Sequence, residues 1–256
     1  GAVLREAVRA SGKLLQCGMQ QRSGEHYQRA KAEIFGKQRL GEVVFVRTFW
    51  SNFPWQARTV AAAPQPAGLD WERFLGPAPK RPFDMFRYDS WRCFSDYGGG
   101  LLADILTHWA DVAQWMMEEQ HPRAALTGGG IYRLHDGRDN PDVVNSIVEY
   151  GEWNLSFEST VLPVRESRAS VMFLGTEGTL DLNRQGYTFT PRKGAVETVA
   201  ASRSLELAHT ANFLEAVRDG AALHAPVETG IEACNPVHLA RTAYGLGGRA
   251  TWEMVR

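Results

Sequence analysis

Cysteine is scarce in this sequence, and so is net charge. The 256 residues include three widely spaced cysteines, Cys17, Cys93 and Cys234, and 28 Lys+Arg against 29 Asp+Glu give a net charge of −1. So few and so scattered cysteines exclude a CxxC zinc or redox motif and are typical of a reducing compartment. The balanced charge argues against non-specific binding to nucleic acid or to an anionic membrane surface.

Long apolar runs and several catalytic signatures are also missing. No stretch approaches the ~20 consecutive apolar residues of a membrane-spanning helix, and no signal-peptide pattern opens the chain. GxSxG, HExxH and the P-loop are absent, which excludes the hydrolases and nucleotidases that use them. Hydrophobic residues at 44% and charged residues at 22% are typical of a globular protein. We therefore predict a cytoplasmic protein with a small-molecule substrate and no nucleic-acid or membrane partner.

The pattern of apolar residues predicts an α+β fold. Helices are expected at 24–37, 100–118, 205–218 and 227–244, and strands at 42–50, 131–134, 143–150, 153–161, 169–174, 179–182 and 187–190, with a final short strand. Residues 51–99, rich in proline, aromatics and arginine, are predicted to be irregular. Because the strands form one block flanked by helices, we predict an open, predominantly antiparallel sheet.

The chain opens on a helix and a strand that have no partners in the rest of the sequence. Apolar residues recur at helical spacing over residues 3–8, Ser11-Gly12 ends the helix, and residues 13–18 predict a short strand. A lone helix and strand cannot make a parallel sheet. We therefore interpret the chain as a fragment of a longer protein.

The sharpest local feature is a pair of polar residues, Asp104 and His108, on the strongly apolar helix after Gly98–Gly100. Residues four apart share a helix face, and a carboxylate beside an imidazole can fix its tautomer and make it a general acid or base. The same pair can supply two metal ligands. Alternatively, Asp104 complements the helix dipole, and His108 is a core histidine whose hydrogen bonds are satisfied.

Two stretches match the spacing of a dinucleotide-binding fingerprint, at Gly98–Ala103 and at Gly245–Ala250. The residues before Gly98 are not a hydrophobic strand, and Ala250 lies too near the C-terminus for a βαβ unit. We interpret both as chance matches, and Gly98–Gly100 as a flexible start of the helix.

Candidate binding residues come from two further segments. The stretch 71–92 carries arginines and a lysine among aromatic side chains, which suits a sugar or a small anion. It can equally be a loop stiffened by proline and packed by its own aromatic rings. Gln20, Gln21 and Arg22 follow the predicted strand at 13–18, where α/β proteins bind ligands, or they form a solvated turn.

Four stretches taken together resemble the glucose-fructose oxidoreductase / inositol dehydrogenase / rhizopine-catabolism (Gfo/Idh/MocA) superfamily. They are SGKLLQCGMQQRSGEHYQRA at 11–30, WERFLGPAPKRPFD at 71–84, WRCFSDYGGGLLADILTHWADVAQW at 91–115 and HTANFLEAVRDGAALHAPVETG at 209–230. The resemblance spans essentially the whole chain. It implies an N-terminal Rossmann domain for NAD(P) and a C-terminal α+β domain whose open sheet binds substrate and often mediates oligomerisation. The family's Asp-x-x-x-His pair, which helps polarise the substrate hydroxyl, falls on Asp104 and His108.

The resemblance also implies what this chain does not contain. The family's glycine-rich nucleotide loop and its Glu-Lys-Pro segment have no counterpart in these residues. We therefore expect residues 1–22 to be a remnant helix and strand of the dinucleotide-binding domain, and residues 23–256 to be the substrate-binding and oligomerisation domain. No NAD(P) is expected on this chain alone, which should not be competent for hydride transfer by itself. The substrate-binding residues we expect are Arg22, Tyr27, Arg87, Trp91 and Arg92.

Two alternatives to this truncated sugar- or polyol-type oxidoreductase stay open at this point. In the first, the former substrate pocket holds a divalent metal such as zinc, and a metal-bound water hydrolyses an ester or phosphotriester. Asp104 and His108 would then need a third ligand, for which the candidates are His26, His135 and Glu158. In the second, the protein is a non-catalytic dimeric scaffold. In either case we expect a homo-oligomer through the sheet face, because an open sheet exposes apolar area.

Overall fold

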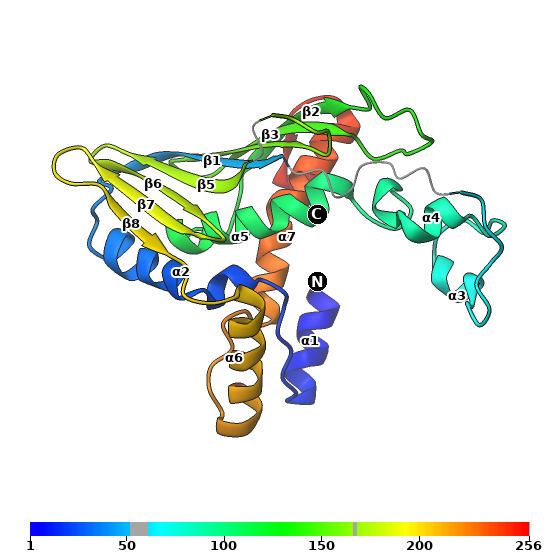
Figure 1. The fold of residues 1–256 in the computed structure, drawn as a ribbon, viewed down its shortest axis with the longest axis horizontal. Coiled ribbons are helices and arrows are strands. Elements are labelled where there is room, and N and C mark those ends of the chain that lie inside the picture. The colour runs from blue at the N-terminus through cyan, green and yellow to red at the C-terminus, as the bar shows by residue number, and fades with distance from the viewer. Residues whose placement is uncertain (52–60, 166–167, 256) are drawn as a thin grey trace.

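One large sheet dominates the computed structural model, which describes residues 1–51, 61–165 and 168–255. Within these residues the sheet has nine strands in the order β8-β7-β6-β5-β1-β4-β3-β2-β9 (Figure 1). The strands are β1 (Val43–Ser51), β2 (Ala124–Gly130), β3 (Val143–Glu149), β4 (Asn154–Thr160), β5 (Ala169–Gly175), β6 (Gly178–Asn183), β7 (Gly186–Pro191), β8 (Glu197–Ala200) and β9 (Ala250–Thr251). β1 and β4 pair in parallel, and the other neighbouring pairs run antiparallel. The predicted α+β class and the open, mostly antiparallel sheet are confirmed.

Three helices cover one face of this sheet, namely α2 (Glu25–Ala30), α5 (Thr107–Met117) and α7 (Val227–Leu246). The other helices of the described residues are α1 (Ala2–Ser11), α3 (Trp71–Leu75), α4 (Met85–Asp89) and α6 (Leu205–Asp219). Short 3-10 or π-helical turns are η1 (Gln20–Ser23), η2 (Lys31–Phe35), η3 (Trp91–Cys93), η4 (Leu102–Leu106) and η5 (Trp252–Met254). α7 packs on β2 and β3, α5 packs on β5, and α2 packs on β7 (Figure 1). In the described ranges, no helix combines the length and the apolar character needed to cross a bilayer.

The alternation of side chains along the strands gives the sheet one buried and one open face. Val46 on β1 lies beside Leu155 on β4 and Phe173 on β5, and all three side chains are buried. Because successive side chains of a strand point to opposite faces, Arg47 and Glu158 lie on the other side. There they form an ion pair at 3.1 Å and remain partly exposed. The core therefore lies between the sheet and the helices.

At the N-terminus, the predicted helix forms but the predicted strand does not. α1 ends where Gly12 adopts a φ of 62°, as the Ser11-Gly12 pair predicts. The strand expected at 13–18 is wrong, because this segment makes a single bridge, from Gln16 to Pro226. The Cys17 N–H donates to the Ala225 carbonyl at 2.8 Å, so the segment lies against the residues that lead into α7 rather than in a sheet.

The first strand after the apolar helix is displaced from its predicted position. A strand was expected at 131–134, whereas β2 covers Ala124–Gly130. The cause is Asp142, whose carboxylate accepts the backbone N–H groups of residues 132, 133 and 134 at 2.9, 2.8 and 2.8 Å. These amides are used in a turn and cannot pair with a strand. β8, which the sequence did not indicate, extends the other edge of the sheet.

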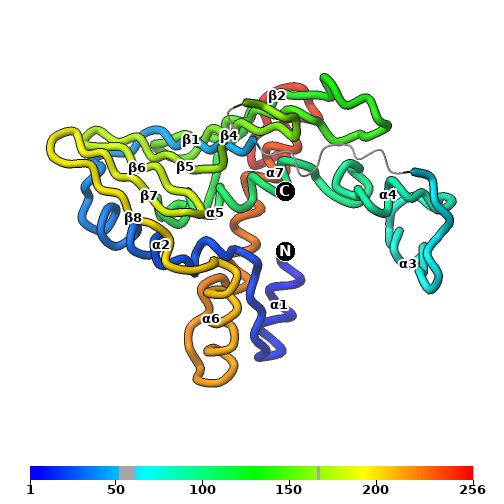
Figure 2. Tube along the Cα trace, viewed as in Figure 1, coloured from blue at the N-terminus to red at the C-terminus, as the bar shows by residue number. Residues whose placement is uncertain are grey.

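The stretch expected to be irregular folds into a small arm, residues 71–97, that lies apart from the sheet at the end opposite β8 (Figure 2). Its helices α3 and α4 begin after Asp70 and Asp84, whose carboxylates accept N–H groups of the first helical turn. Aromatic rings fill the arm, with Trp71 stacked on Phe74 at a centroid distance of 5.1 Å. Residues 52–60 of the same predicted stretch lie outside the described residues.

Candidate functional site

Asp104 lies in a π-helical turn, η4, that continues directly into α5. Such turns widen a helix locally and occur frequently at functional sites. The Asp104 carboxylate accepts a hydrogen bond from Nε of Arg92 at 2.7 Å. Burial raises the pKa of Asp104, and the Arg92 guanidinium opposes that rise. Asp104 is thus paired with a cation on the arm side of the helix, at the edge of the solvent.

His108 lies one turn further along, and its side chain is mostly buried. Burial lowers the pKa of His108, and the positive charge of Arg184 lowers it further, so the ring is neutral at pH 7. Its Nδ1 is buried and has no hydrogen-bond partner among the described residues. Among the described residues, the Asp104 carboxylate accepts its hydrogen bond from Arg92 and not from His108. A catalytic role for Asp104 and His108 remains a prediction.

The glycine triplet before this helix is a packed turn rather than a flexible start. Gly100 has a φ of 55°, and a Cβ there would lie 3.0 Å from Asn140. The Asn140 amide donates to the carbonyl of Arg92 at 2.9 Å and to that of Gly98 at 3.1 Å. Asn140 thereby ties the backbone that carries Arg92 to the start of the helix that carries Asp104.

The fold does not give either glycine-rich match the surroundings of a dinucleotide site. The residues before Gly98 form η3 and a turn, not a strand, and Gly245 lies inside α7. A dinucleotide fingerprint needs a strand, a glycine turn and a helix in succession. The described residues at these two places therefore do not fit a nicotinamide dinucleotide.

Asp111 is a further polar residue on the same helix that the sequence analysis did not single out. Arg22 of η1 donates to it from Nε at 2.9 and 3.0 Å and from a terminal nitrogen at 2.8 Å. The Arg22 guanidinium also lies 5.2 Å from the ring centroid of Trp115. Burial raises the pKa of Asp111 to about 6, although Arg22 acts against the rise. An aspartate three residues after His108 on an apolar helix was the available signal, and a substrate role for Arg22 remains a prediction.

Two predicted site residues at the start of the chain lie in the core. Tyr27 was expected to bind substrate, but its side chain is fully buried. His26 is buried next to it and donates from Nε2 to the Asn183 carbonyl at 3.0 Å. Helical spacing places both residues on the inner side of α2, which is why they face the sheet.

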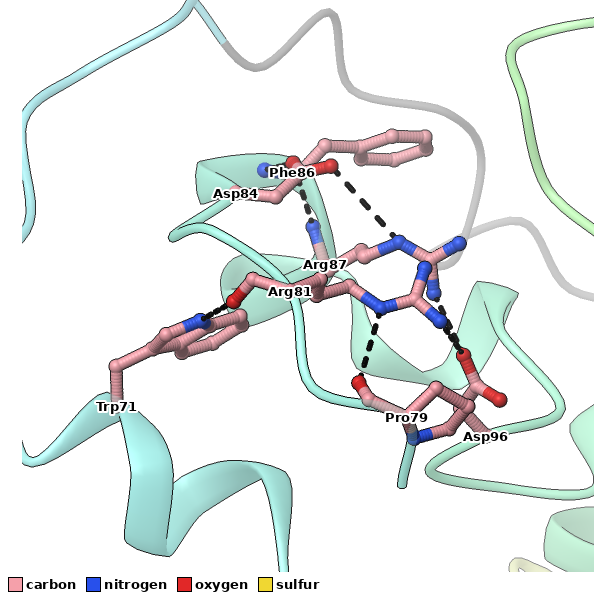
Figure 3. A network of polar contacts seen from close by, with 7 residues as sticks. All are labelled: Trp71, Pro79, Arg81, Asp84, Phe86, Arg87 and Asp96. Carbon is pink, nitrogen blue, oxygen red and sulfur yellow. Dashed lines mark hydrogen bonds and ion pairs between the residues drawn. The ribbon is translucent and has the colours of Figure 1, made fainter.

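The arginines of the arm are engaged with the arm itself. Arg81 and Arg87 converge on the Asp96 carboxylate at 2.7 and 3.0 Å (Figure 3). The Arg87 guanidinium also lies 4.1 Å from the ring centroid of Phe94. This arrangement favours the interpretation of a loop packed by its own aromatic rings. Arg92, which lies 4.1 Å from the ring centroid of Trp91, is the arginine of this segment that faces Asp104; substrate binding by Arg87, Trp91 and Arg92 remains a prediction.

The metal site expected as an alternative is not formed. No group of three His, Cys, Asp or Glu side chains in the described residues is placed to hold a metal ion. Glu158 pairs with Arg47 on the open face of the sheet, and His26 is bonded to a backbone carbonyl. His135 is exposed in the segment between β2 and β3. Zinc and the metal-dependent hydrolase therefore find no support in the fold.

Comparison with known proteins identifies this region. Residues 37–125 match the model of the Gfo/Idh/MocA oxidoreductase family, C-terminal alpha/beta domain. Over these residues the chain is similar to the C-terminal domain of that family. The matched segment of that domain contains both Asp104 and His108. No curated protein matches the sequence.

Solved structures have a similar fold over nearly the whole chain. An NAD binding oxidoreductase from Klebsiella pneumoniae is 14% identical, with a TM-score of 0.72, over 98% of this chain and 69% of that one. The aldose-aldose oxidoreductase from Caulobacter crescentus in complex with glycerol is 15% identical, with a TM-score of 0.70, over 97% and 67%. An Agrobacterium radiobacter oxidoreductase in complex with NAD+, L-tartaric acid and magnesium is 13% identical, with a TM-score of 0.69, over 100% and 70%. The chain thus spans about two thirds of the length of these structures, and the shared property is the fold.

Proposed function

We propose that this Gfo/Idh/MocA C-terminal domain binds the substrate of an NAD(P)-dependent oxidoreductase that acts on a sugar or polyol hydroxyl. The observation that carries the proposal is the family match over residues 37–125, because it includes the helical turn with Asp104 and His108. Structures of similar fold include an aldose-aldose oxidoreductase and an inositol dehydrogenase homolog from Azotobacter vinelandii in complex with NADH and myo-inositol. These names favour sugars and polyols as the substrate class.

Asp104 and His108 have different roles in this proposal. Arg92 donates to one oxygen of the Asp104 carboxylate, Oδ2, which leaves Oδ1 to accept a hydrogen bond from a substrate hydroxyl. Because its pKa is lowered, the His108 ring is neutral at pH 7 and can take a proton from that hydroxyl. Its Nδ1 is buried, so Nε2 is the nitrogen that can reach the substrate.

A nicotinamide, when bound, takes up or supplies the hydride at the substrate carbon. The described residues form no cradle for it, so we propose that a dinucleotide-binding domain, in the same or another polypeptide, packs on this domain. α1 and α6 offer apolar side chains for such a contact, because Val3, Leu207 and Val217 are 84%, 69% and 58% exposed. Exposed apolar area of this kind is typical of a protein contact.

Ligand binding by the chain itself tests the proposal. We expect one or more members of a panel of sugars and polyols to bind, as detected by ligand-observed NMR. His108→Gln and Asp104→Asn should each weaken that binding about tenfold or more, which is the effect of losing one charge-assisted hydrogen bond. His121→Gln, which changes an exposed histidine, is the matched control and should bind as the unaltered chain does. Binding should weaken in acid, because protonation removes the acceptor nitrogen of His108. Full affinity in His108→Gln, or no binding of any member of the panel, would contradict the proposal.

We also propose that a second copy of the chain packs on the open face of the sheet. Leu126 and Ile147 are 42% and 45% exposed on that face, beside a hollow of about 490 Å³ that both residues line. Ile147→Asp should convert a dimer to a monomer in light scattering, and Val196→Asp, which alters an exposed position just before β8, should not. A monomeric unaltered chain would contradict this part of the proposal.

A further inference from the structure

The hydroxyl of Ser23 lies between two imidazoles that come from distant parts of the chain. Ser23 ends η1, His209 belongs to α6, and His224 lies in the connection from α6 to α7. The Ser23 Oγ is 2.7 Å from Nδ1 of His209 and 2.9 Å from Nδ1 of His224. Nε2 of His209 is 2.8 Å from the carbonyl oxygen of Cys17. Ser23 is buried, so these polar groups depend on one another for hydrogen bonds.

This chain of hydrogen bonds determines where each proton lies. A carbonyl only accepts, so Nε2 of His209 donates to Cys17, and Nδ1 of the neutral ring is an acceptor. The Ser23 hydroxyl therefore donates to His209 and accepts from the Nδ1–H of His224. A proton added to His209 would occupy Nδ1 and leave the buried Ser23 hydroxyl without its acceptor. The arrangement is complete only while His209 is neutral.

The net effect of the surroundings disfavours protonation of the His224 ring. Burial lowers the pKa of His224, the neighbouring His209 lowers it further, and the carboxylate of Glu215 on α6 opposes both effects. A histidine whose pKa is lowered by folding contributes stability above its unfolded pKa of about 6.5, and this stability is lost as the pH falls. Acidification therefore weakens the contact between these segments.

One other group near Ser23 changes charge over the same pH range, because burial raises the pKa of Asp111, the partner of Arg22, to about 6. Burial raises the pKa of the Cys17 thiol, which keeps it uncharged. Arg22, the residue before Ser23, is neutralised by Asp111 at 2.8 Å. A variant of His209 therefore separates the clasp from the Arg22–Asp111 pair, because it leaves that pair unaltered.

We propose that Ser23, His209 and His224 form a pH-sensitive clasp that holds residues 16–24 against α6 at neutral pH and releases them on acidification. Asn212 binds backbone atoms of Ala222 and His224 at 2.9 and 2.8 Å, so the connection after α6 stays attached to α6 when the clasp opens. The parts that separate are η1 with the segment before it, on one side, and α6 on the other. This inference does not rest on the proposed function.

Hydrogen exchange of the full chain tests the clasp. Between about pH 7.5 and about pH 5, we expect exchange in residues 16–24, corrected for intrinsic rates, to increase about tenfold or more, while the central strands stay protected. In His209→Asn, the side-chain oxygen takes the place of Nδ1 and accepts from Ser23 without titrating, so this increase should disappear. His135→Asn, which alters an exposed histidine outside the clasp, should keep the full increase.

Three results would overturn the clasp. The first is equal protection of residues 16–24 at both pH values in the unaltered chain, and the second is an undiminished response in His209→Asn. The third needs no variant. It is an NMR titration of the unaltered chain in which His209 takes up a proton while the amide resonances of Cys17 and Ser23 do not move.

Discussion

Two arginine–aspartate pairs hold the helical segment that runs from η4 through α5, and they differ mainly in burial. The outer pair joins Arg92 to Asp104 at 2.7 Å, with side chains 42% and 24% exposed. The inner pair joins Arg22 to Asp111 at 2.8 Å, with side chains 14% and 2% exposed. The two pairs have the same chemistry and nearly the same distance. The difference between them shows that the surroundings, not the contact, determine what an ion pair does.

Water screens the outer pair and is excluded from the inner one. Exposed ion pairs contribute about 0–1 kcal/mol, so Arg92 adds little stability and mainly keeps Asp104 charged beside the candidate site. A buried pair is costly to break, because the remaining charge has no partner. The inner pair therefore fastens η1 to α5, while the outer pair adjusts the chemistry of the site.

Breaking the inner pair should have the largest effect. Arg22→Gln leaves Asp111 buried without its cation, and we expect the free energy of unfolding at pH 7 to fall by about 3–5 kcal/mol, as measured by urea denaturation. The pKa of Asp111 is raised to about 6, so its contribution to stability is present below its unfolded pKa and is lost as the pH rises through about 6. The loss in Arg22→Gln should therefore shrink towards pH 4.

A double variant provides the control for this result. Arg22→Met with Asp111→Leu removes both charges and keeps the volume, so it should cost much less than Arg22→Gln alone. An Arg22→Gln variant as stable as the unaltered chain would show that the inner pair does not fasten the helix, and the contrast with the outer pair would fail.

The sequence predicts the sheet and the main helices because their apolar periodicity reports burial directly. In strands such as β3 and β5, and in the helix around Trp109, the apolar residues recur at the spacing that puts them on the buried side. It fails where one side chain reorganises the backbone, as Asp142 does with the N–H groups after β2. Periodicity carries no information about such a long-range carboxylate contact.

The candidate site was only half accessible from the sequence for the same reason. The four-residue spacing predicted that Asp104 and His108 share one face, but it could not give the partner of Asp104. That partner depends on the turn that Asn140 holds, and Asn140 is distant in sequence. The inner pair was missed because an aspartate buried by a distant arginine resembles any other polar residue on an apolar helix. The roles of Asp104 and Asp111 therefore depend on which arginine the fold brings to each of them, and not on the residue type alone.

The backbone turn that supports the outer pair should give an intermediate effect. Gly100 has a φ of 55°, and a Cβ would lie 3.0 Å from Asn140, so Gly100→Ala should lower the free energy of unfolding by about 1–3 kcal/mol. Gly128→Ala is the control, because a Cβ at Gly128 in β2 meets no atom within 4 Å. If Gly100→Ala and Gly128→Ala were equally stable, the turn at Gly100 would not need a glycine, and the packing of this turn on Asn140 would not be what positions Arg92.

Removing the outer pair should have the smallest effect on stability and a distinct effect on charge. In Arg92→Gln we expect the free energy of unfolding to change by less than about 1 kcal/mol, because the pair is screened by water. The pKa of Asp104, which Arg92 lowers against the effect of burial, should rise, as measured by NMR titration of the carboxyl carbon. Arg87→Gln breaks the comparable pair with Asp96 in the arm and should leave the Asp104 titration unchanged. If Arg92→Gln instead destabilised the chain as much as Arg22→Gln does, exposure to solvent would not explain the difference between the two pairs. Arg92 would then be a structural residue of the arm rather than the group that sets the charge of Asp104.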